Sequence, residues 1–454
     1  ANGAPGTPII VHGELYTYSG KELLRLDSET GEVLARGEMQ GSSSFAITPP
    51  AYAEGMIFVA LGGGKVQAFN ALTLESLWLY TDSLGIEAGS NQPNCPITYS
   101  NGCIYTGFWN SEEAAAHMVC LTITDEDPSQ PLEAKMPLWV RTQSGGFYWA
   151  GTLATDNYVL VGTEDGEKGN ESQTSSLLSL NPISGALLDS IDGLNGDVRS
   201  TVSYDAATDS YYFTSSNGSF YSVKVKENGR FVSDSLKEIN LGGRSVSTPV
   251  IHNGRAYVGV QGAAQFKMYD GHHIAVIDLA TWSIAYTANT KGFPQTSGLL
   301  TTGYGDEVYV YFADNYTPGS LRVIRDKPGQ TKLADPVSET YTSGGKRITV
   351  DNCAPVLFTP QGNLAQYCIA SPVADKDGTI YMKNDSNHIF AIGSKVESIE
   401  LVQEPDKTRY DAGEKFDPTG MKVIAHLANG AQKDITNSKL LTWRDDALEG
   451  NEIT

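Results

Sequence analysis

The sequence predicts an all-β protein built mainly as a β-propeller, and three observations lead to this prediction. A strand–turn–strand pattern recurs along most of the chain at roughly 50-residue spacing, the length of one propeller blade. Tyr (23 residues) outnumbers Phe (14), and Gly (47) makes up about a tenth of the 454 residues, which is typical of strands joined by tight turns. No segment keeps a convincing apolar face at helical spacing. We expect eight blades, or seven if the terminal copies combine into one closing blade.

Each copy of the repeat begins with a short strand, passes through a turn containing Gly, Asn or Asp, and continues into a strand of alternating Tyr, Val and Ile. A second element follows in several copies: an Asp or Asn, then Thr or Ser three residues later, between two strands. Each copy therefore holds about four strands, the content of one blade. The copies begin at Pro8, Pro50, Pro96, Thr152, Thr201, Pro249, Gly298 and Pro372, and the second element begins at Asp27, Asn70, Asn181 and Asp278.

Composition limits the partners. Lys and Arg number 32 against 53 Asp and Glu, a formal net charge of −21. Because nucleic acids and anionic membranes attract clustered Lys and Arg, neither is expected as the main partner. No apolar run approaches the ~20 residues of a membrane-spanning helix, so we expect no membrane insertion within this chain.

The five cysteines form no C-x-x-C pair, so a structural zinc site has no support. One disulfide, within 95–120 or between Cys353 and Cys368, and unpaired buried thiols remain alternatives.

The composition changes after about Ser394, where strands separated by Pro, Gly and Asn-Gly turns replace the repeat. We expect a propeller over residues 1–395 and a small β-sandwich domain over 396–454.

The repeat resembles the pyrroloquinoline-quinone-like (PQQ-like) propeller repeat. That repeat occurs in quinoprotein dehydrogenases and in the eight-bladed outer-membrane barrel-assembly lipoprotein. The clearest matches are AYVGVQG at 256–262 with IDLAT at 277–281, RLDSETGEV at 25–33 and SSLLSLNPISGALL at 175–188. The resemblance covers about 390 residues and implies a fold far more than a chemistry.

The segment from Pro405 to Val423 resembles a group-3 bacterial immunoglobulin-like domain, a module that recurs as a stalk on surface proteins of Gram-positive bacteria. Segments 145–153, 294–302 and 314–330 also resemble large clostridial surface proteins. These resemblances imply an extracellular, cell-surface protein. We expect the immunoglobulin-like module to lack its last strand here and the natural protein to continue beyond it.

The resemblance to quinoproteins implies a testable alternative, a dehydrogenase that uses PQQ and Ca²⁺. Such enzymes share an adjacent Cys-Cys pair, a Trp beneath the quinone and acidic calcium ligands, and this sequence has no adjacent Cys pair. We expect Trp78 and Trp139 to pack between blades instead. No cofactor is therefore predicted.

Other catalytic and metal-binding patterns are absent from the sequence. It contains no G-x-S-x-G and no H-E-x-x-H motif. The acidic stretch 164–171 offers oxygen ligands, but without calcium-loop spacing a solvated surface loop is the better interpretation. We predict no catalytic and no metal-binding residue.

Propeller geometry still predicts where a ligand binds. The loops that lead into the innermost strands and those that join the second and third strands lie on one face, around the mouth of the central channel, and loops on a rigid scaffold often carry function. Three successive aromatic residues after Gly145-Gly146 either bind a ligand there or pack against the next blade. The candidate ligand-binding residues are Trp109, Phe147, Tyr148, Trp149, Arg199, Arg244, Gln295, Asp314, Asn315, Tyr316 and Tyr367, together with the loop 262–272.

Aromatic rings beside Asn, Asp, Gln and Arg suit a sugar ring or a peptide. The preferred hypothesis is a cell-surface recognition, adhesion or scaffold protein that binds a glycan, a peptide or a surface protein without catalysis. The alternatives are the quinoprotein dehydrogenase and a polysaccharide-degrading enzyme.

Overall fold

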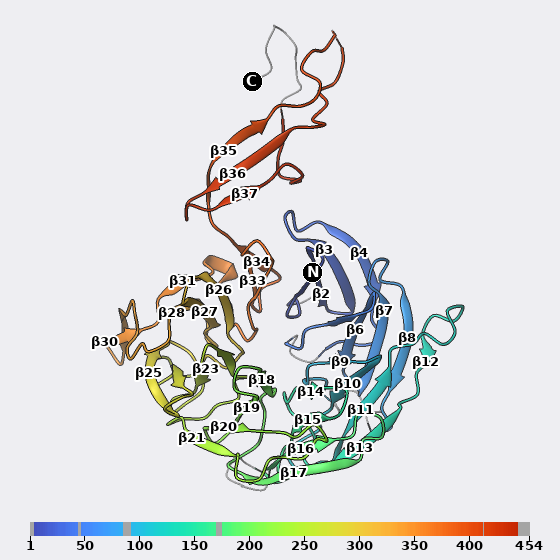
Figure 1. Ribbon diagram of the computed structural model, residues 1–454, viewed down its shortest axis with the longest axis vertical. Helices are drawn as coiled ribbons and strands as arrows, with labels where there is room; N and C mark the ends of the chain where they lie inside the picture. The colour runs from blue at the N-terminus through green and yellow to red at the C-terminus, as the bar shows by residue number, and fades with distance from the viewer. Residues whose placement is uncertain (1–3, 44–46, 85–91, 169–174, 412, 444–454) are drawn as a thin grey trace.

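The computed structural model describes residues 4–43, 47–84, 92–168, 175–411 and 413–443. In these ranges the chain consists of β-strands, turns and one short 3₁₀ turn, η2 (Gly362–Leu364). Eight small antiparallel sheets stand in a ring around a central axis, and the chain passes through them in order (Figure 1). The all-β prediction is confirmed. The sheets β1–β4 and β32–β34 are separate, so the blades number eight rather than seven.

The first four blades are regular sheets whose first strand lies nearest the axis. Blade 1 contains β1 (Ile9–Val11), β2 (Glu14–Ser19), β3 (Glu22–Asp27) and β4 (Val33–Glu38). Blade 2 contains β5 (Ala51–Ala53), β6 (Met56–Leu61), β7 (Lys65–Asn70) and β8 (Ser76–Thr81). Blade 3 contains β9 (Thr98–Ser100), β10 (Cys103–Gly107), β11 (Ala116–Thr122) and β13 (Trp139–Gln143). Blade 4 contains β14 (Leu153–Ala154), β15 (Val159–Gly162), β16 (Ser175–Leu180) and β17 (Leu187–Leu194).

The second half of the ring follows the same order, with a shorter last blade. Blade 5 contains β18 (Ser203–Asp205), β19 (Ser210–Ser215), β20 (Ser219–Val223) and β21 (Lys237–Asn240). Blade 6 contains β22 (Val250–His252), β23 (Arg255–Val260), β24 (His273–Asp278) and β25 (Ser283–Asn289). Blade 7 contains β26 (Leu299–Tyr304), β27 (Glu307–Ala313), β28 (Leu321–Asp326) and β31 (Val356–Phe358). Blade 8 contains β32 (Val373–Ala374), β33 (Ile380–Lys383) and β34 (Ile389–Ile392).

Two insertions cover the outer edges of preceding blades. β12 (Glu133–Ala134), from the loop of blade 3, pairs in parallel with β8 of blade 2. The hairpin of β29 (Val337–Ser343) and β30 (Lys346–Cys353), from blade 7, joins the edge of blade 6 through β25. Because exposed sheet edges invite pairing with other chains, these insertions protect the outer strands they cover.

The repeated turn has a clear physical basis. In each of four blades, the side chain of an Asp or Asn accepts hydrogen bonds from the backbone N–H groups two and three residues later, at 2.9–3.0 Å. Such a turn needs a short polar acceptor at its first position. The acceptors are Asp27, Asn70, Asn181 and Asp278.

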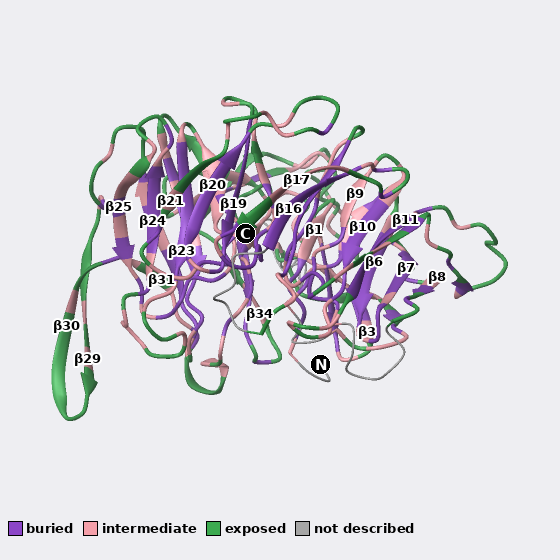
Figure 2. Ribbon diagram, turned by 90° about the horizontal axis from the view of Figure 1, so that it is seen from below, coloured by how far each residue is buried: buried purple, intermediate pink, exposed green. Residues whose placement is uncertain are grey.

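The hydrophobic core lies between neighbouring blades. Figure 2 shows that the strands of the ring are largely buried, whereas many loops and the β29–β30 hairpin are exposed. Trp78 packs among blades 2 and 3, and Trp139 among blades 3 and 4, as predicted for blade-packing residues. The Trp139 Nε1–H donates to the Pro182 carbonyl oxygen at 2.9 Å. All five cysteines are free thiols, so neither of the alternative disulfides forms.

Beyond the ring, β35 (Val396–Gln403), β36 (Lys422–Leu427) and β37 (Gln432–Asp434) form a separate three-stranded sheet, which projects from the ring in Figure 1. Within residues 396–411 and 413–443 this is one sheet, so the predicted two-sheet sandwich stays a prediction, and residues 444–454 lie outside the described part. In the described ranges, no helix is long and apolar enough to cross a membrane.

Candidate functional site

A cavity of about 360 Å³ occupies the axis of the ring. Every blade contributes to its wall through the residues at the beginning of its innermost strand or just before it, which we call the approach segment. One lining residue from each blade, in chain order, is Thr7, Thr48, Asn94, Trp149, Arg199, Val246, Gln295 and Ala370. Three of the predicted site residues, Trp149, Arg199 and Gln295, therefore share one cavity.

Hydrogen bonds between successive approach segments fix the cavity wall. The Thr7 hydroxyl donates to the Ile47 carbonyl oxygen at 2.7 Å, and the Thr48 hydroxyl donates to that of Pro93 at 2.9 Å. Across the ring, the Ser247 hydroxyl donates to the Thr296 carbonyl oxygen at 2.9 Å. These bonds link the approach segments of blades 1 and 2, of blades 2 and 3, and of blades 6 and 7, so this part of the wall is pre-formed.

Glycines at the ends of second strands let the approach segments come close. A Cβ atom on Gly162 would lie 2.1 Å from Val198 Cγ1, beside Arg199. A Cβ atom on Gly259 would lie 1.6 Å from the Pro294 carbonyl oxygen, beside Gln295. The glycine of the repeated Val-Gly pattern thus serves close packing between blades and places the residues that face the cavity.

Three stacked aromatic rings lie at the rim of the cavity. The Tyr148 ring stacks on Trp109 and on Trp149, with ring centroids 4.4 Å apart in both pairs. The guanidinium carbon of Arg199 lies 5.0 Å from the centre of the Tyr148 ring. Phe147 instead is completely buried in the core between blades 3 and 4. Of the three successive aromatic residues 147–149, Phe147 is thus packed in the core, whereas Tyr148 and Trp149 lie at the rim.

Several polar atoms of this region are buried without a hydrogen-bond partner among the described residues. They include the indole N–H groups of Trp109 and Trp149, as well as Asn94 Oδ1 and Thr296 Oγ1. A buried polar group without a partner costs free energy comparable to a lost hydrogen bond. Because Trp149, Asn94 and Thr296 also line the cavity, a ligand with both acceptors and donors would satisfy them.

Arg199 lies in a buried cluster of charges. Its Nε and Nη2 donate to the two carboxylate oxygens of Glu164 at 2.7 and 2.6 Å, and Nη2 lies 3.0 Å from Asp197 Oδ2. Burial raises the pKa of Glu164 to about 7, although the Arg199 guanidinium pulls it down. Burial also raises the pKa of Asp197. The cluster holds Arg199 in place beside the cavity.

The acidic stretch 164–171 differs from its prediction at its first residue. Glu164 is 2% exposed rather than solvated, because its carboxylate binds Arg199. The Asp165 backbone N–H donates to Asp197 Oδ1 at 3.0 Å. Asn170 and Glu171 lie outside the described residues. In the described ranges, no three His, Cys, Asp or Glu side chains gather as a metal site would require.

The remaining predicted residues, except Arg244, lie on the opposite side of the mouth from the aromatic stack. Arg244 is half-buried. Burial and nearby Arg199 lower its pKa. Asn315 Nδ2 donates to Gln295 Oε1 at 2.7 Å. The loop 262–272 reaches this side, where Phe266 lies 6.4 Å from the Tyr367 ring. The Lys291 ammonium lies 4.9 Å from the centre of the Tyr316 ring.

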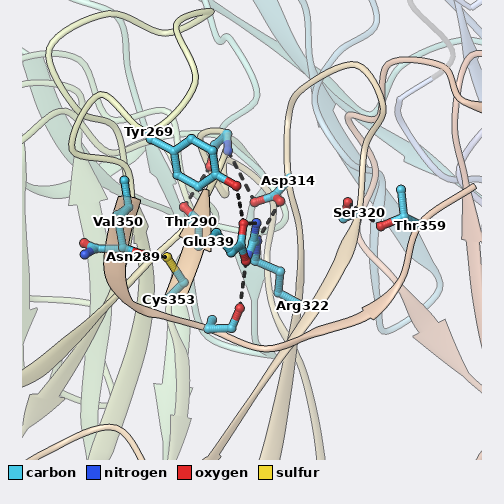
Figure 3. Close-up of polar contacts among 12 residues, drawn as sticks. Tyr269, Asn289, Thr290, Asp314, Ser320, Arg322, Glu339, Val350, Cys353 and Thr359 are labelled. Carbon is cyan, nitrogen blue, oxygen red and sulfur yellow. Dashed lines mark hydrogen bonds and ion pairs between the residues drawn. The ribbon is translucent and has the colours of Figure 1, made fainter. Parts of the chain in front are cut away.

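Asp314 belongs to an internal ion network rather than to the exposed face (Figure 3). Its carboxylate accepts a hydrogen bond from Arg322 Nε at 2.6 Å, and its side chain is 0% exposed. Arg322 Nη1 donates to Glu339 Oε1 at 2.6 Å, and the Tyr269 hydroxyl donates to the same carboxylate. This network anchors β29 to β28.

Sequence reasoning missed two sets of residues at this site. Glu164 and Asp197 were not recognised as partners of Arg199, because nothing local indicates a pairing between loops of blades 4 and 5. The hydroxyl and amide groups in the wall, such as Thr48 and Asn94, were missed as well. The recurring Thr-Pro before innermost strands, as at Thr7-Pro8, Thr48-Pro49 and Thr248-Pro249, is the signal that could have identified part of the wall.

Comparisons with known proteins agree with this architecture. Residues 2–111 match the family described as outer membrane protein assembly factor BamB. The crystal structure of BamB from Moraxella catarrhalis has a TM-score of 0.52 at 11% identity, covering 85% of this chain and 95% of that one. The chain folds as a PQQ-like β-propeller.

Two further solved structures resemble this PQQ-like propeller. The quinohemoprotein alcohol dehydrogenase from Comamonas testosteroni has a TM-score of 0.56 at 14% identity, covering 92% of this chain and 78% of that one. Saccharomyces cerevisiae Sqt1 has a TM-score of 0.51 at 10% identity, covering 95% of both chains. At these identities the likeness shows the fold alone. No curated protein matches the sequence.

Proposed function

We propose that this PQQ-like propeller is a non-catalytic recognition protein that binds a glycan, a peptide or a segment of a surface protein at the mouth of its axial cavity. One observation carries the proposal: the stacked rings of Trp109, Tyr148 and Trp149 reach the cavity wall at Trp149, and the buried indole N–H groups of Trp109 and Trp149 have no acceptor among the described residues. A ligand rich in oxygen atoms would provide acceptors for these N–H groups.

The size and chemistry of the cavity support such a ligand. A volume of about 360 Å³ lies within the range of small-molecule pockets, roughly 300–1,000 Å³. Aromatic faces favour the C–H side of a sugar ring or a peptide side chain, and the amide of Asn94 and hydroxyl of Thr296 add polar contacts. A rigid wall keeps the entropy cost of binding low.

A PQQ-dependent dehydrogenase fits these residues less well. Bound PQQ would supply the oxidising chemistry, and it carries carboxylates that need cationic partners, with Ca²⁺ held by acidic ligands. At the mouth, Glu164 binds Arg199 with both oxygens, and Asp197 lies in the same cluster. The Arg199 guanidinium and these two carboxylates are therefore already paired with one another rather than placed for a quinone and its calcium, so we assign no PQQ-dependent step.

The geometry also gives little support to a polysaccharide-degrading enzyme. Glycoside hydrolysis commonly uses two carboxyl groups that act on the bond from either side. Here the buried Glu164 carboxylate near the mouth is held in a bidentate ion pair by Arg199. We therefore place recognition ahead of catalysis.

We further propose that the protein works outside the cell, at the cell surface of a Gram-positive bacterium. The resemblance of residues 405–423 to bacterial immunoglobulin-like stalks supports this location. Treatment of intact cells with an added protease would test it. Loss of the chain from intact cells is expected; complete protection until the cells are lysed would contradict the location.

The binding proposal is tested by screening the immobilised chain against glycan and peptide arrays. Any ligand found should bind Trp109→Ala and Trp149→Ala variants more weakly by roughly 30-fold, the effect of losing ~2 kcal/mol at a binding hot spot. The matched control is Trp443→Ala, because Trp443 lies in the C-terminal segment.

Circular dichroism would verify that the variants fold. Equal affinity of all three variants for the ligand would overturn the site, and release of shortened glycan products would overturn the non-catalytic assignment.

A further inference from the structure

A second pocket of about 220 Å³ lies between blades 5 and 6, whose strands stand side by side in Figure 2. Its residues come from the beginning of β19 and β21, the end of β20 and the turn between β24 and β25. In a blade these positions are at the end opposite to the approach segments. The pocket therefore opens on the opposite face of the ring from the axial site, and the two are independent.

The pocket is positively charged in a protein of net charge −21. Lys224 and Lys237 both line it, and no carboxylate belongs to its lining. Neither lysine forms an ion pair with the described carboxylates, whereas lysines elsewhere do, among them Lys135, Lys267, Lys376 and Lys407. Two unpaired ammonium groups on one small pocket suit an anion.

Two acidic residues near the pocket are engaged in other hydrogen bonds. The Asp205 carboxylate accepts hydrogen bonds from the backbone N–H and hydroxyl of Thr208. Glu238 follows Lys237 in β21, so its side chain points to the other side of the sheet, where it accepts hydrogen bonds from Ser219 and Tyr221. Neither carboxylate forms an ion pair with Lys224 or Lys237.

An aromatic ring and a row of hydroxyl groups complete the pocket. The Lys237 ammonium lies 5.4 Å from the centre of the Trp282 ring, and the Trp282 indole N–H donates to the Glu238 carbonyl oxygen at 3.2 Å, which fixes the ring. The hydroxyl-bearing residues of the lining are Thr208, Ser210, Tyr212, Ser222 and Ser235. A flat ring beside hydroxyls is an arrangement that suits a sugar.

Comparison between blades shows that the repeat does not require a Trp at this position. Trp282 follows the Asp278–Thr281 turn with φ 52°, and Leu74 follows the equivalent Asn70–Thr73 turn in blade 2 with φ 59°. Leu74 is buried, at 2% exposure, whereas Trp282 is only half-buried and lines a pocket. The exposed part of the Trp282 ring therefore does not serve the packing between blades.

We propose that this pocket binds an anionic saccharide, with the sugar ring against Trp282 and its phosphate, sulfate or carboxylate group between Lys224 and Lys237. The hydroxyl groups of the lining face the sugar hydroxyls. The protein then carries two separate recognition sites, one on each face of the ring.

The test measures binding of glucose 6-phosphate and of glucuronate by calorimetry at low ionic strength, with glucose and inorganic phosphate as separate probes. We expect at least one anionic sugar to bind ~10-fold or more tightly than either glucose or phosphate alone. Lys237→Gln and Trp282→Leu should each weaken that binding by ~10-fold, about 1.4 kcal/mol. Leucine is chosen because Leu74 occupies the equivalent position.

The control variant is Lys226→Gln, which removes a nearby exposed lysine that does not line the pocket. Trp149→Ala should leave this binding unchanged, so failure here and failure of the axial site are distinguishable. Absence of saturable binding, equal weakening by Lys226→Gln, or binding of phosphate as tight as that of both anionic sugars would overturn the proposal.

Discussion

At the scale of single residues, the mouth contains a carboxyl group, Glu164, whose pKa is well above its usual value. Glu164 is buried against Arg199, and its pKa is raised to about 7 from an ordinary value of 4.5, first by burial. Between pH 4.5 and 7 the folded chain therefore holds this proton more tightly than the unfolded chain. By linkage, the contribution of Glu164 to stability falls as the pH rises through this window.

We predict that the melting temperature of the wild-type chain falls more between pH 5 and pH 8 than that of Glu164→Gln, whose side chain stays neutral. Calorimetric scans of both proteins across this range measure the difference. Parallel pH profiles would mean that Glu164 does not titrate there.

At the scale of elements, the β29–β30 hairpin is held to the ring by one ion network. Arg322 in β28 donates to Glu339 in β29, and Arg322 and Tyr269 lower the pKa of Glu339 despite its partial burial. Since the folded pKa is below the unfolded value, this anchor is fully present above the unfolded pKa of 4.5. It is lost as the pH falls through the folded pKa.

We predict that Glu339→Gln loosens the hairpin by about 1.5–3 kcal/mol, the usual contribution of a hydrogen bond to a charged group. Amide exchange in β29 and β30 should accelerate by ~10-fold or more while the inner strands of blade 6 keep their protection. Glu307→Gln is the control, because Glu307 pairs with exposed Arg325 and Lys327 at 3.6 and 3.7 Å. Equal exchange in the two variants would show that the network does not anchor the hairpin.

At the scale of elements, local features of the structure could be predicted from the sequence, whereas contacts between distant loops could not. The strands and turns were predictable because their determinants are local: Asp27 and Asn70 bond to N–H groups two and three residues later. The pairing of Arg199 with Glu164 joins loops 35 residues apart and leaves no periodic signal. Phe147 and Trp149 are both aromatic, and only the packing of neighbouring blades decides that one is buried and the other faces the cavity.

At the scale of the whole molecule, the C-terminal sheet contacts the ring where blades 1 and 8 meet. The Lys439 ammonium donates to Asp27 at 2.6 Å, and the Lys433 ammonium lies 3.2 Å from Asp377. The Lys439 side chain is the leading cause that lowers the pKa of Asp27 to about 2. These ion pairs are solvent-accessible, and such pairs are weak and screened by salt. The ring, by contrast, closes through Tyr381 of blade 8, whose hydroxyl donates to the Ser28 carbonyl oxygen at 3.1 Å.

We therefore predict that the sheet can leave the ring without unfolding it. A Lys433→Ala/Lys439→Ala variant should show a larger radius of gyration by X-ray scattering and an unchanged melting temperature of the ring, and high salt should produce the same change in the wild-type chain. Lys422→Ala is the matched control, because Lys422 pairs with Asp434 inside the sheet. If the double variant scatters like the control, contacts other than these ion pairs hold the sheet, and the ring and its C-terminal extension behave as one rigid unit.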